Sequence, residues 1–254
     1  MKGRSPSSSI PTKHSSPRAA GAPGAEAWTV RRALGELARQ ASKRNVAGMA
    51  RFGIRAKHVF GVSKPKLDEI ARKIGPNHAL GLQLWETGIH DARLLGVLIS
   101  EADRVTGKQM ERWVKGFDNW DVCDGTCCHL FVDAQPAWKK AFAWSGRKSE
   151  FEKRAGFALA AYLAIHDKTT GDRPFEKYLQ TIERQAGDER NFVRKAVNWA
   201  LRNIGKRNQR LNRQAITCAE RIRNSGTRAG RWIAADALRE LKSEAVQNRL
   251  KRKP

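Results

Sequence analysis

The segment from Phe117 to Phe131, FDNWDVCDGTCCHLF, holds the residues of this chain best suited to chemistry. It places three carboxylates and a tryptophan close together in a protein that is otherwise strongly cationic. If the segment is helical, Trp120 and Asp124 lie four residues apart and share one face. An ionised carboxylate beside an aromatic ring suits a site that meets a positive charge, or a sugar that becomes cationic.

A helix is expected here because cap-forming residues come before the apolar ones. Asp118 followed by Asp121 indicates an N-cap and a first-turn acid, so the helix should start near Asn119. A plainer interpretation is open at this stage. In it the tryptophan is a core residue, and the acids pair with nearby lysine or arginine side chains on a capped helix.

The cysteines of this segment raise the possibility of a metal site. Cys123 and Cys127 share a helix face and His129 lies nearby, but the paired spacing of zinc ligands is missing. With Cys128 and Cys218 the chain has four cysteines, too few for a disulfide framework at this length. We therefore expect buried, reduced helix cysteines, no metal and no cofactor.

The composition indicates a polyanionic partner. The chain has 254 residues, 49 Lys and Arg against 25 Asp and Glu, and a formal charge of +24. Such an excess predicts salt-sensitive binding to phosphates. No stretch approaches the ~18 consecutive apolar residues of a membrane span, so nucleic acid is favoured over a membrane surface.

Helical periodicity begins at Trp28 and does not give way to strand alternation. Apolar residues recur at three- and four-residue spacing in about a dozen short segments separated by Gly and Pro, which predicts an all-α domain over residues 28–242. Residues 1–27 are rich in Ser, Pro, Gly and Ala and predict a disordered basic arm without a secretory signal. Residues 243–254 are expected to form a frayed basic C-terminal tail.

Several of the helical segments share a common plan. Those beginning at Asp91, Phe151, Phe192 and Thr227 each run from basic and polar residues through small ones into an apolar stretch. The last two offsets are 41 and 35 residues, close to the ~33–47-residue period of helical-repeat arrays. Such pairs stack into a curved solenoid with a concave face, although an irregular bundle is also compatible with the pattern.

The densest basic run extends from Arg190 to Arg213 and contains no acidic residue. Trp199 lies in its middle, and lysines and arginines around an aromatic ring suit a nucleic-acid surface. The alternative is a basic helix with one buried tryptophan. The cations that we expect at the surface are Arg194, Lys195, Arg202, Lys206 and Arg207.

Four motifs in this order resemble the AlkD-like DNA alkylation-repair glycosylases. They are MARF ending at Phe52, WDVCD from Trp120 to Asp124, KRAGF around Arg154, and KAVNWALRNIGKRN around Trp199. The resemblance covers roughly residues 47–210. It implies a HEAT-like helical-repeat solenoid with a concave basic face that wraps DNA.

The resemblance also implies roles for individual residues. Asp124 matches the catalytic carboxylate, and Trp120 and Trp199 match the aromatic pair that contacts the sugar and backbone of the lesion. Arg154 matches an arginine that binds the DNA backbone. Phe52 stands where the family usually has Tyr, so a hydroxyl that could contact DNA is missing.

The expected function is therefore release of cationic alkylpurines, such as N3-methyladenine and N7-methylguanine, from double-stranded DNA. The expected protein acts as a monomer in the cytoplasm, near the nucleoid, without an obligatory protein partner. Two other functions share the same charge pattern: non-catalytic binding of damaged or branched DNA, and binding of RNA. The adjacent Trp120 and Asp124 favour the enzyme.

Overall fold

The structure is a computed structural model that describes residues 27–252, so all but the last residue of the expected N-terminal arm lies outside the described residues. Within this range there are fourteen α-helices, two 3-10 turns and no strand, which confirms the all-α prediction. The helices are α1 (Val30–Arg39), α2 (Lys43–Arg51), α3 (Lys64–Ile74), α4 (His78–Glu86), α5 (His90–Ile99), α6 (Gly107–Lys115), α7 (Trp120–His129), α8 (Ala137–Ser145), α9 (Glu150–His166), α10 (Asp172–Gln185), α11 (Asn191–Gly205), α12 (Gln209–Asn224), α13 (Arg228–Leu241) and α14 (Glu244–Lys251).

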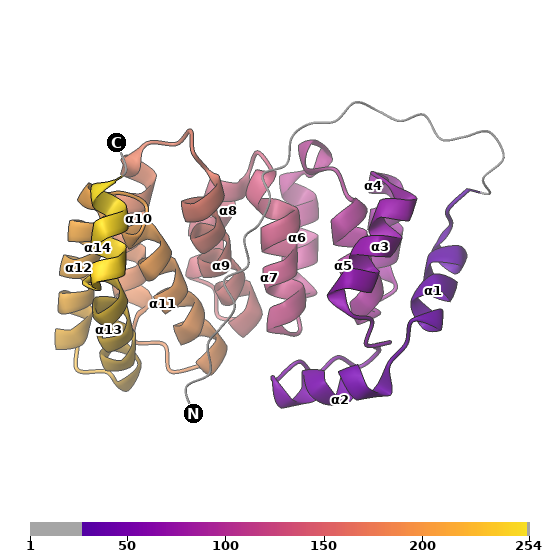
Figure 1. Ribbon diagram of the computed structural model, residues 1–254, viewed down its shortest axis with the longest axis horizontal. Helices are drawn as coiled ribbons and strands as arrows, with labels where there is room; N and C mark the ends of the chain where they lie inside the picture. The colour runs from indigo at the N-terminus through magenta and orange to yellow at the C-terminus, as the bar shows by residue number, and fades with distance from the viewer. Residues whose placement is uncertain (1–26, 253–254) are drawn as a thin grey trace.

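From α3 to α13 the helices stand in two rows. Helices α3, α5, α7, α9, α11 and α13 contact one another in sequence, and we call them the odd row. Helices α4, α8 and α12 pack against their odd-row neighbours, and α8, α10 and α12 form part of the second, even row. Figure 1 shows the helices following one another along the long axis of the molecule, from α1 at one end to α12, α13 and α14 at the other.

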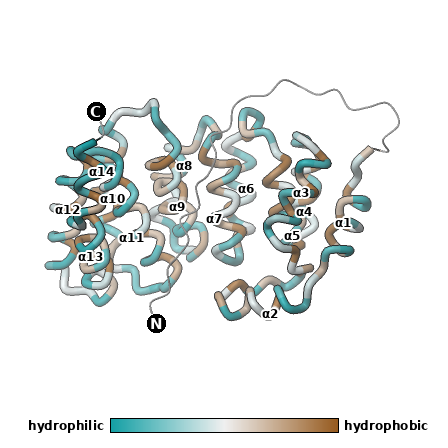
Figure 2. Tube along the Cα trace, viewed as in Figure 1, coloured by the Kyte–Doolittle hydropathy of each residue, from teal (hydrophilic) through white to brown (hydrophobic). Residues whose placement is uncertain are grey.

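The core lies between the two rows because most helices are hydrophobic on one face only. Figure 2 shows hydrophobic and hydrophilic stretches alternating along most helices. Large aromatic residues fill the centre: the rings of Trp85 and Trp113 stack at 4.1 Å between centroids, and Phe131 lies 6.1 Å from Trp113. Stacked aromatic pairs of this kind add to the stabilisation that area burial alone supplies.

Side-chain hydrogen bonds link several odd-row helices to the next one, at sequence separations that differ from repeat to repeat. The Cys127 thiol donates to the carbonyl of Ala155, 28 residues on, and Asn198 donates to Asp236, 38 residues on. Helices α9, α11 and α13 begin at residues 150, 191 and 228, close to the offsets expected from the sequence. The repeat predicted from the sequence is thus present in the structure.

The two ends of the array differ from the middle. Figure 1 shows α2 lying crosswise to the other helices and apart from them, and none of its residues is buried. At the other end the expected frayed tail is wrong for residues 244–251, which form α14. Ser243 caps this helix by accepting from the amide of Val246, and Val246 and Leu250 are buried.

Candidate active site

The acidic segment forms the N-terminal half of α7, as the sequence predicts, but its cap is a different residue. Asn119 is the N-cap, and its side-chain oxygen accepts from the amides of Asp121 and Val122 at 3.0 Å each. Asp118 was expected in this role. It lies one residue too early, and it accepts from the Asn119 side chain instead, at 2.7 Å.

Two of the three acids of this segment bind residues of α5. Both carboxylate oxygens of Asp118 accept from Nη2 of Arg93, at 2.8 and 2.9 Å. Asp121 lies 3.1 Å from Nε2 of the buried His90. Since the Asn119 amide group faces the other ring nitrogen of His90, the ring donates to Asp121 through Nε2. Sequence inspection missed Arg93 and His90, because both belong to the preceding repeat.

Asp124, the candidate catalytic carboxylate, binds Arg154 of α9 in a bidentate ion pair. Nε and Nη2 of the guanidinium donate to the two carboxylate oxygens at 2.8 and 2.6 Å. Nη1 of Arg154 donates to the carbonyl of Phe192 in α11, at 2.7 Å. One arginine therefore joins three successive odd-row helices. The two side chains are 14% and 9% exposed, so the pair lies at the edge of the core with one side open.

The protonation of Asp124 reflects two opposing effects. Burial raises the pKa of its carboxyl above the ordinary value of 3.8, while the charge and hydrogen bonds of Arg154 lower it in part. The same burial lowers the pKa of Arg154, but the carboxylate more than compensates and raises it. Asp124 therefore titrates at a higher pH than an exposed aspartate, while its two bonds from Arg154 favour the ionised form.

Trp120 lies one turn before Asp124, and its hydrogen-bond partner comes from the end of α2, outside the two rows of helices. Its indole Nε1 donates to the carbonyl of Phe52, at the end of α2, over 2.9 Å. Phe52 itself is 74% exposed, the most exposed of the large apolar side chains in the described part of the chain. Gly53, with a φ of +78°, turns the chain here, and a Cβ at this position would lie 3.0 Å from the ring of Phe192. The Trp120 ring is thus fixed in orientation rather than buried.

Trp199 of α11 contacts the ring of Tyr162 on α9, a residue that the motifs did not single out. The two rings meet edge to face, with centroids 4.8 Å apart and planes at 81°. Burial raises the pKa of the Tyr162 hydroxyl, and the neighbouring Cys128 and Asp124 raise it further. Tyr162 therefore lies between Trp199 on α11 and the Asp124 face of α7.

Three of the five cations expected at the surface contact α13. The Arg194 guanidinium lies 5.2 Å from the ring centroid of Trp232. Arg202 and Lys206 both bind Glu240, the lysine at 2.5 Å. The acids of α13 therefore offset the charges of Arg202 and Lys206 but not that of Arg194, which the sequence of the basic run alone does not reveal.

The remaining two cations differ from each other. Lys195 is exposed on α11. Arg207 donates to the carbonyls of Ala164 and Thr170 and lies 4.3 Å above the ring centroid of Phe175. Arg207 therefore binds the C-terminal end of α9, and Lys195 is the exposed one among these five cations.

A cleft of about 800 Å³ opens beside Trp120 between α2 and helices α3, α5 and α7. Its walls are mainly apolar, with Met49, Leu67 and Leu94 among the lining residues, and Asp121 and His129 of α7 line it as well. No sequence motif indicated this cleft, because its residues come from four separate helices.

The cysteines pack into the repeat. Cys123, Cys127 and Cys218 are buried, and their thiols donate to backbone carbonyls of Phe151, Ala155 and Leu179. The buried cysteines that we expected are thereby confirmed at three positions, while Cys128 is partly exposed. Among residues 27–252 no three His, Cys, Asp or Glu side chains gather as a possible metal site.

The two rows of stacked helices define a helical-repeat protein. The sequence profile of the DNA alkylation repair enzyme family matches residues 33–241, and the chain belongs to this family. No curated protein sequence matches the chain. In the described range, no helix is both long and apolar enough for a membrane span.

One similar solved structure is described as "a new family of proteins related to the HEAT-like repeat DNA glycosylases with affinity for branched DNA structures". The two structures superpose with a TM-score of 0.71 at 19% sequence identity, over 88% of this chain and 96% of that one. The likeness confirms the HEAT-like repeat fold that the motifs implied.

Proposed function

We propose that this protein is a DNA glycosylase that releases cationic N3- and N7-alkylpurines from duplex DNA. The observation that carries the proposal is the placement of the Asp124 carboxylate, one helical turn from the anchored Trp120 and joined through Arg154 to α11, the helix that carries Trp199. An alkylated purine carries a positive charge and leaves as a neutral base. Its departure makes the deoxyribose cationic, and a carboxylate fixed beside C1′ stabilises that cation.

The bond changes of this reaction are simple. The electron pair of the C1′–N bond goes to the departing nitrogen, which neutralises the base. Water then adds to C1′, and its proton passes through Asp124 to solvent. The indole faces of Trp120 and Trp199 add cation–π attraction to the sugar. No general acid for the base is required, because the lesion supplies the positive charge.

Arg154 supports this role in two ways. It orients Asp124 by two parallel hydrogen bonds. A guanidinium has five N–H donors, and Arg154 uses three of them on Asp124 and the Phe192 carbonyl. The two that remain can bind a phosphate at the lesion, so that one side chain couples DNA binding to the position of the carboxylate.

The test is base release from DNA that contains 7-methylguanine. Asp124→Asn keeps the shape of the side chain but removes its charge, so release should fall about a hundredfold, a loss of ~3 kcal/mol in transition-state stabilisation. DNA affinity should stay the same or rise, and the urea midpoint serves as the check on folding. Asp121→Asn is the matched control, because it changes a carboxylate three residues away on the same helix. Parental release by folded Asp124→Asn would remove Asp124 from the mechanism.

The second candidate is a non-catalytic protein that binds damaged or branched DNA. The feature that favours it is the bidentate Asp124–Arg154 pair itself, which is compatible with a purely structural carboxylate. The similar solved structure comes from proteins with affinity for branched DNA, and the same property here would be consistent with this role. A protein of this kind would bind a four-way junction more tightly than a linear duplex and release no 7-methylguanine.

A further inference from the structure

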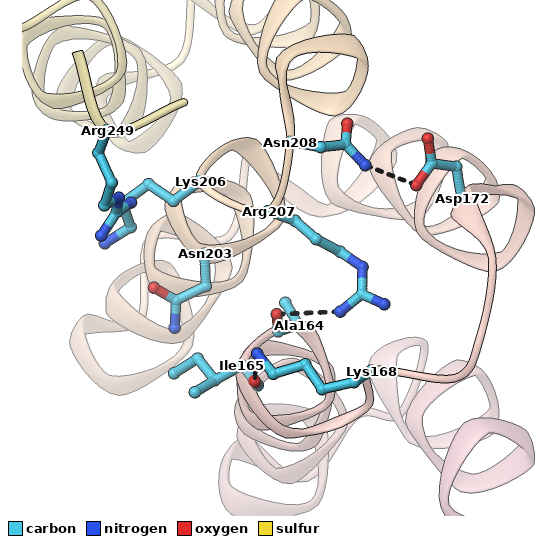
Figure 3. A pocket seen from close by; sticks show the side chains of 9 residues that line it. All are labelled: Ala164, Ile165, Lys168, Asp172, Asn203, Lys206, Arg207, Asn208 and Arg249. Carbon is cyan, nitrogen blue, oxygen red and sulfur yellow. Dashed lines mark hydrogen bonds between the residues drawn. The ribbon is translucent and has the colours of Figure 1, made fainter. Parts of the chain in front are cut away.

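A basic pocket lies at the far end of α9 and α11, away from the Asp124–Arg154 pair. It has a volume of about 570 Å³, and we call it the edge pocket. Figure 3 shows Lys168 and Arg207 reaching into it from one side and Lys206 and Arg249 from the other. The remaining lining residues are Ala164, Ile165, Asp172, Asn203 and Asn208.

The edge pocket carries an excess of positive charge. Four cations line it, and Asp172 is the one acid of its lining. The Asp172 carboxylate accepts from the Asn208 side chain at 2.8 Å. Glu240 adds a second negative charge nearby through its bond to Lys206. With both acids counted, a net charge of about +2 remains in the pocket, which suits an anionic group.

Two of the four cations, Lys168 and Arg207, bind backbone carbonyls of the protein itself. Arg207 donates to the carbonyls of Ala164 and Thr170, and Lys168 donates to that of Ile165, so both neutralise the negative end of α9. Arg249 makes no contact of this kind. It is exposed on α14, and no hydrogen bond or ion pair of its side chain occurs within residues 27–252. Its guanidinium can therefore bind an incoming group without breaking a contact.

The edge pocket continues the surface that carries Trp199. Asn203 of α11 and its C-cap residue Lys206 follow Trp199 by four and seven positions, so all three lie on one side of the helix. At 1.5 Å per residue Lys206 lies roughly 10 Å along the axis from Trp199. That distance is roughly three steps of the duplex, since each step rises 3.4 Å per strand. DNA held at Trp199 can therefore reach the edge pocket.

We propose that the edge pocket binds a backbone phosphate of the DNA that occupies the candidate active site, a few nucleotides from the lesion. The inference rests on the proposed function only in that DNA lies along α9 and α11. A nucleotide is a poorer occupant, because the lining has no aromatic ring on which a base could stack. The long cationic side chains fit a phosphate, which carries no base information, so the contact adds affinity and fixes register.

The test compares two double variants on undamaged duplex DNA. Lys168→Ala/Arg249→Ala removes two charges from the edge pocket. Lys139→Ala/Arg223→Ala removes two exposed charges from α8 and α12 in the even row. If one phosphate is lost, the slope of log K against log salt should become shallower by roughly 0.9 in the first variant. The control should change the slope little. Equal changes in both variants would overturn the proposal.

A second arm distinguishes the source of the phosphate. Inorganic phosphate is titrated into the wild-type protein by calorimetry, and we expect no saturation in the micromolar range. Micromolar binding that Lys168→Ala/Arg249→Ala abolishes, with an unchanged DNA slope, would make the pocket a site for free anions. Both arms use undamaged DNA or none, so they are independent of base release. A protein without glycosylase activity could therefore still give the expected salt slopes and the expected lack of phosphate saturation.

Discussion

Asp124 and Arg154 meet through two hydrogen bonds of 2.6 and 2.8 Å, and the same guanidinium holds the carbonyl of Phe192 at 2.7 Å. The residue expected to bind the DNA backbone is thus the partner of the residue expected to perform catalysis. This arrangement prevents the carboxylate from turning away from the surface. It also makes the stability of the odd row depend on the pair.

Removal of Arg154 should destabilise the protein more than removal of both charges. Arg154→Met leaves Asp124 without its ion-pair partner at the edge of the core, and breaking such a buried pair costs about 3–5 kcal/mol. The double variant Asp124→Leu/Arg154→Met should recover most of this loss. Urea unfolding followed by circular dichroism measures both. An unchanged urea midpoint for Arg154→Met would show that the pair contributes nothing to stability.

Base release should depend on the ionisation of Asp124. Burial raises the pKa of this carboxyl above 3.8 in the folded protein. The active form is the carboxylate, so the rate should be full well above this raised pKa and fall as the pH drops through it. The rate of 7-methylguanine release is measured from pH 8 downward, with the spontaneous loss of base subtracted. A rate that stays constant down to the ordinary aspartate range would contradict the assignment.

Two cations of α11 should contribute differently to DNA binding. Lys195 is exposed, whereas Arg202 is paired with Glu240 and Asp236. Lys195→Ala should therefore make the salt slope on undamaged duplex shallower by roughly 0.9, the value for one phosphate contact. Arg202→Ala, which removes the same formal charge, should change it less. The opposite order would mean that DNA displaces the α13 acids from Arg202.

The range of lesions tests whether a general acid is involved. A site that stabilises only the sugar should release 3-methyladenine and 7-methylguanine but leave hypoxanthine, uracil and 1,N6-ethenoadenine in place. Those neutral bases need protonation to leave. Chromatography of the released bases from DNA with each lesion measures the range. Efficient release of a neutral base would point to a proton donor, and Asp124 would then be misassigned.

Gly156 is the position where the α8–α9 contact is closest. A Cβ there would lie 2.5 Å from the amide nitrogen of Ser145 and 2.9 Å from the carbonyl oxygen of Ala141. Gly156→Ala should therefore lower the free energy of unfolding by roughly 2 kcal/mol or more, since backbone cannot move aside easily. Gly35→Ala is the control, because a Cβ there meets nothing within 4 Å. It should stabilise α1 by up to ~1 kcal/mol.

Sequence periodicity was enough to predict the helices and the shared face of Trp120 and Asp124. Both depend on residues within one turn of each other, where spacing determines position. The cap assignment failed because Asp118 and Asn119 are both good N-cap residues, and the choice depends on Arg93 in the previous repeat. That arginine binds Asp118 and leaves Asn119 to cap the helix.

The basic run shows a different limit. A window of sequence counts the charges of α11 but does not see the neighbouring helix. Asp236 and Glu240 on α13 offset Arg202 and Lys206, and they lie 34 to 38 residues further along the chain. Tyr162 and the cleft beside Trp120 were missed for the same reason, since both come from residues brought together across repeats.

Helix α2 stands outside this repeating pattern of contacts. Bonds between neighbouring odd-row helices span 28 to 42 residues, but Trp120 and Phe52 are 68 residues apart, and the close approach of Gly53 to Phe192 joins still more distant positions. Closing the chain loop between α2 and these distant residues costs roughly 1 kcal/mol more in entropy than closing a loop between neighbouring odd-row helices. Since α2 buries none of its own residues to offset that cost, it should dock last during folding and open first in the native state.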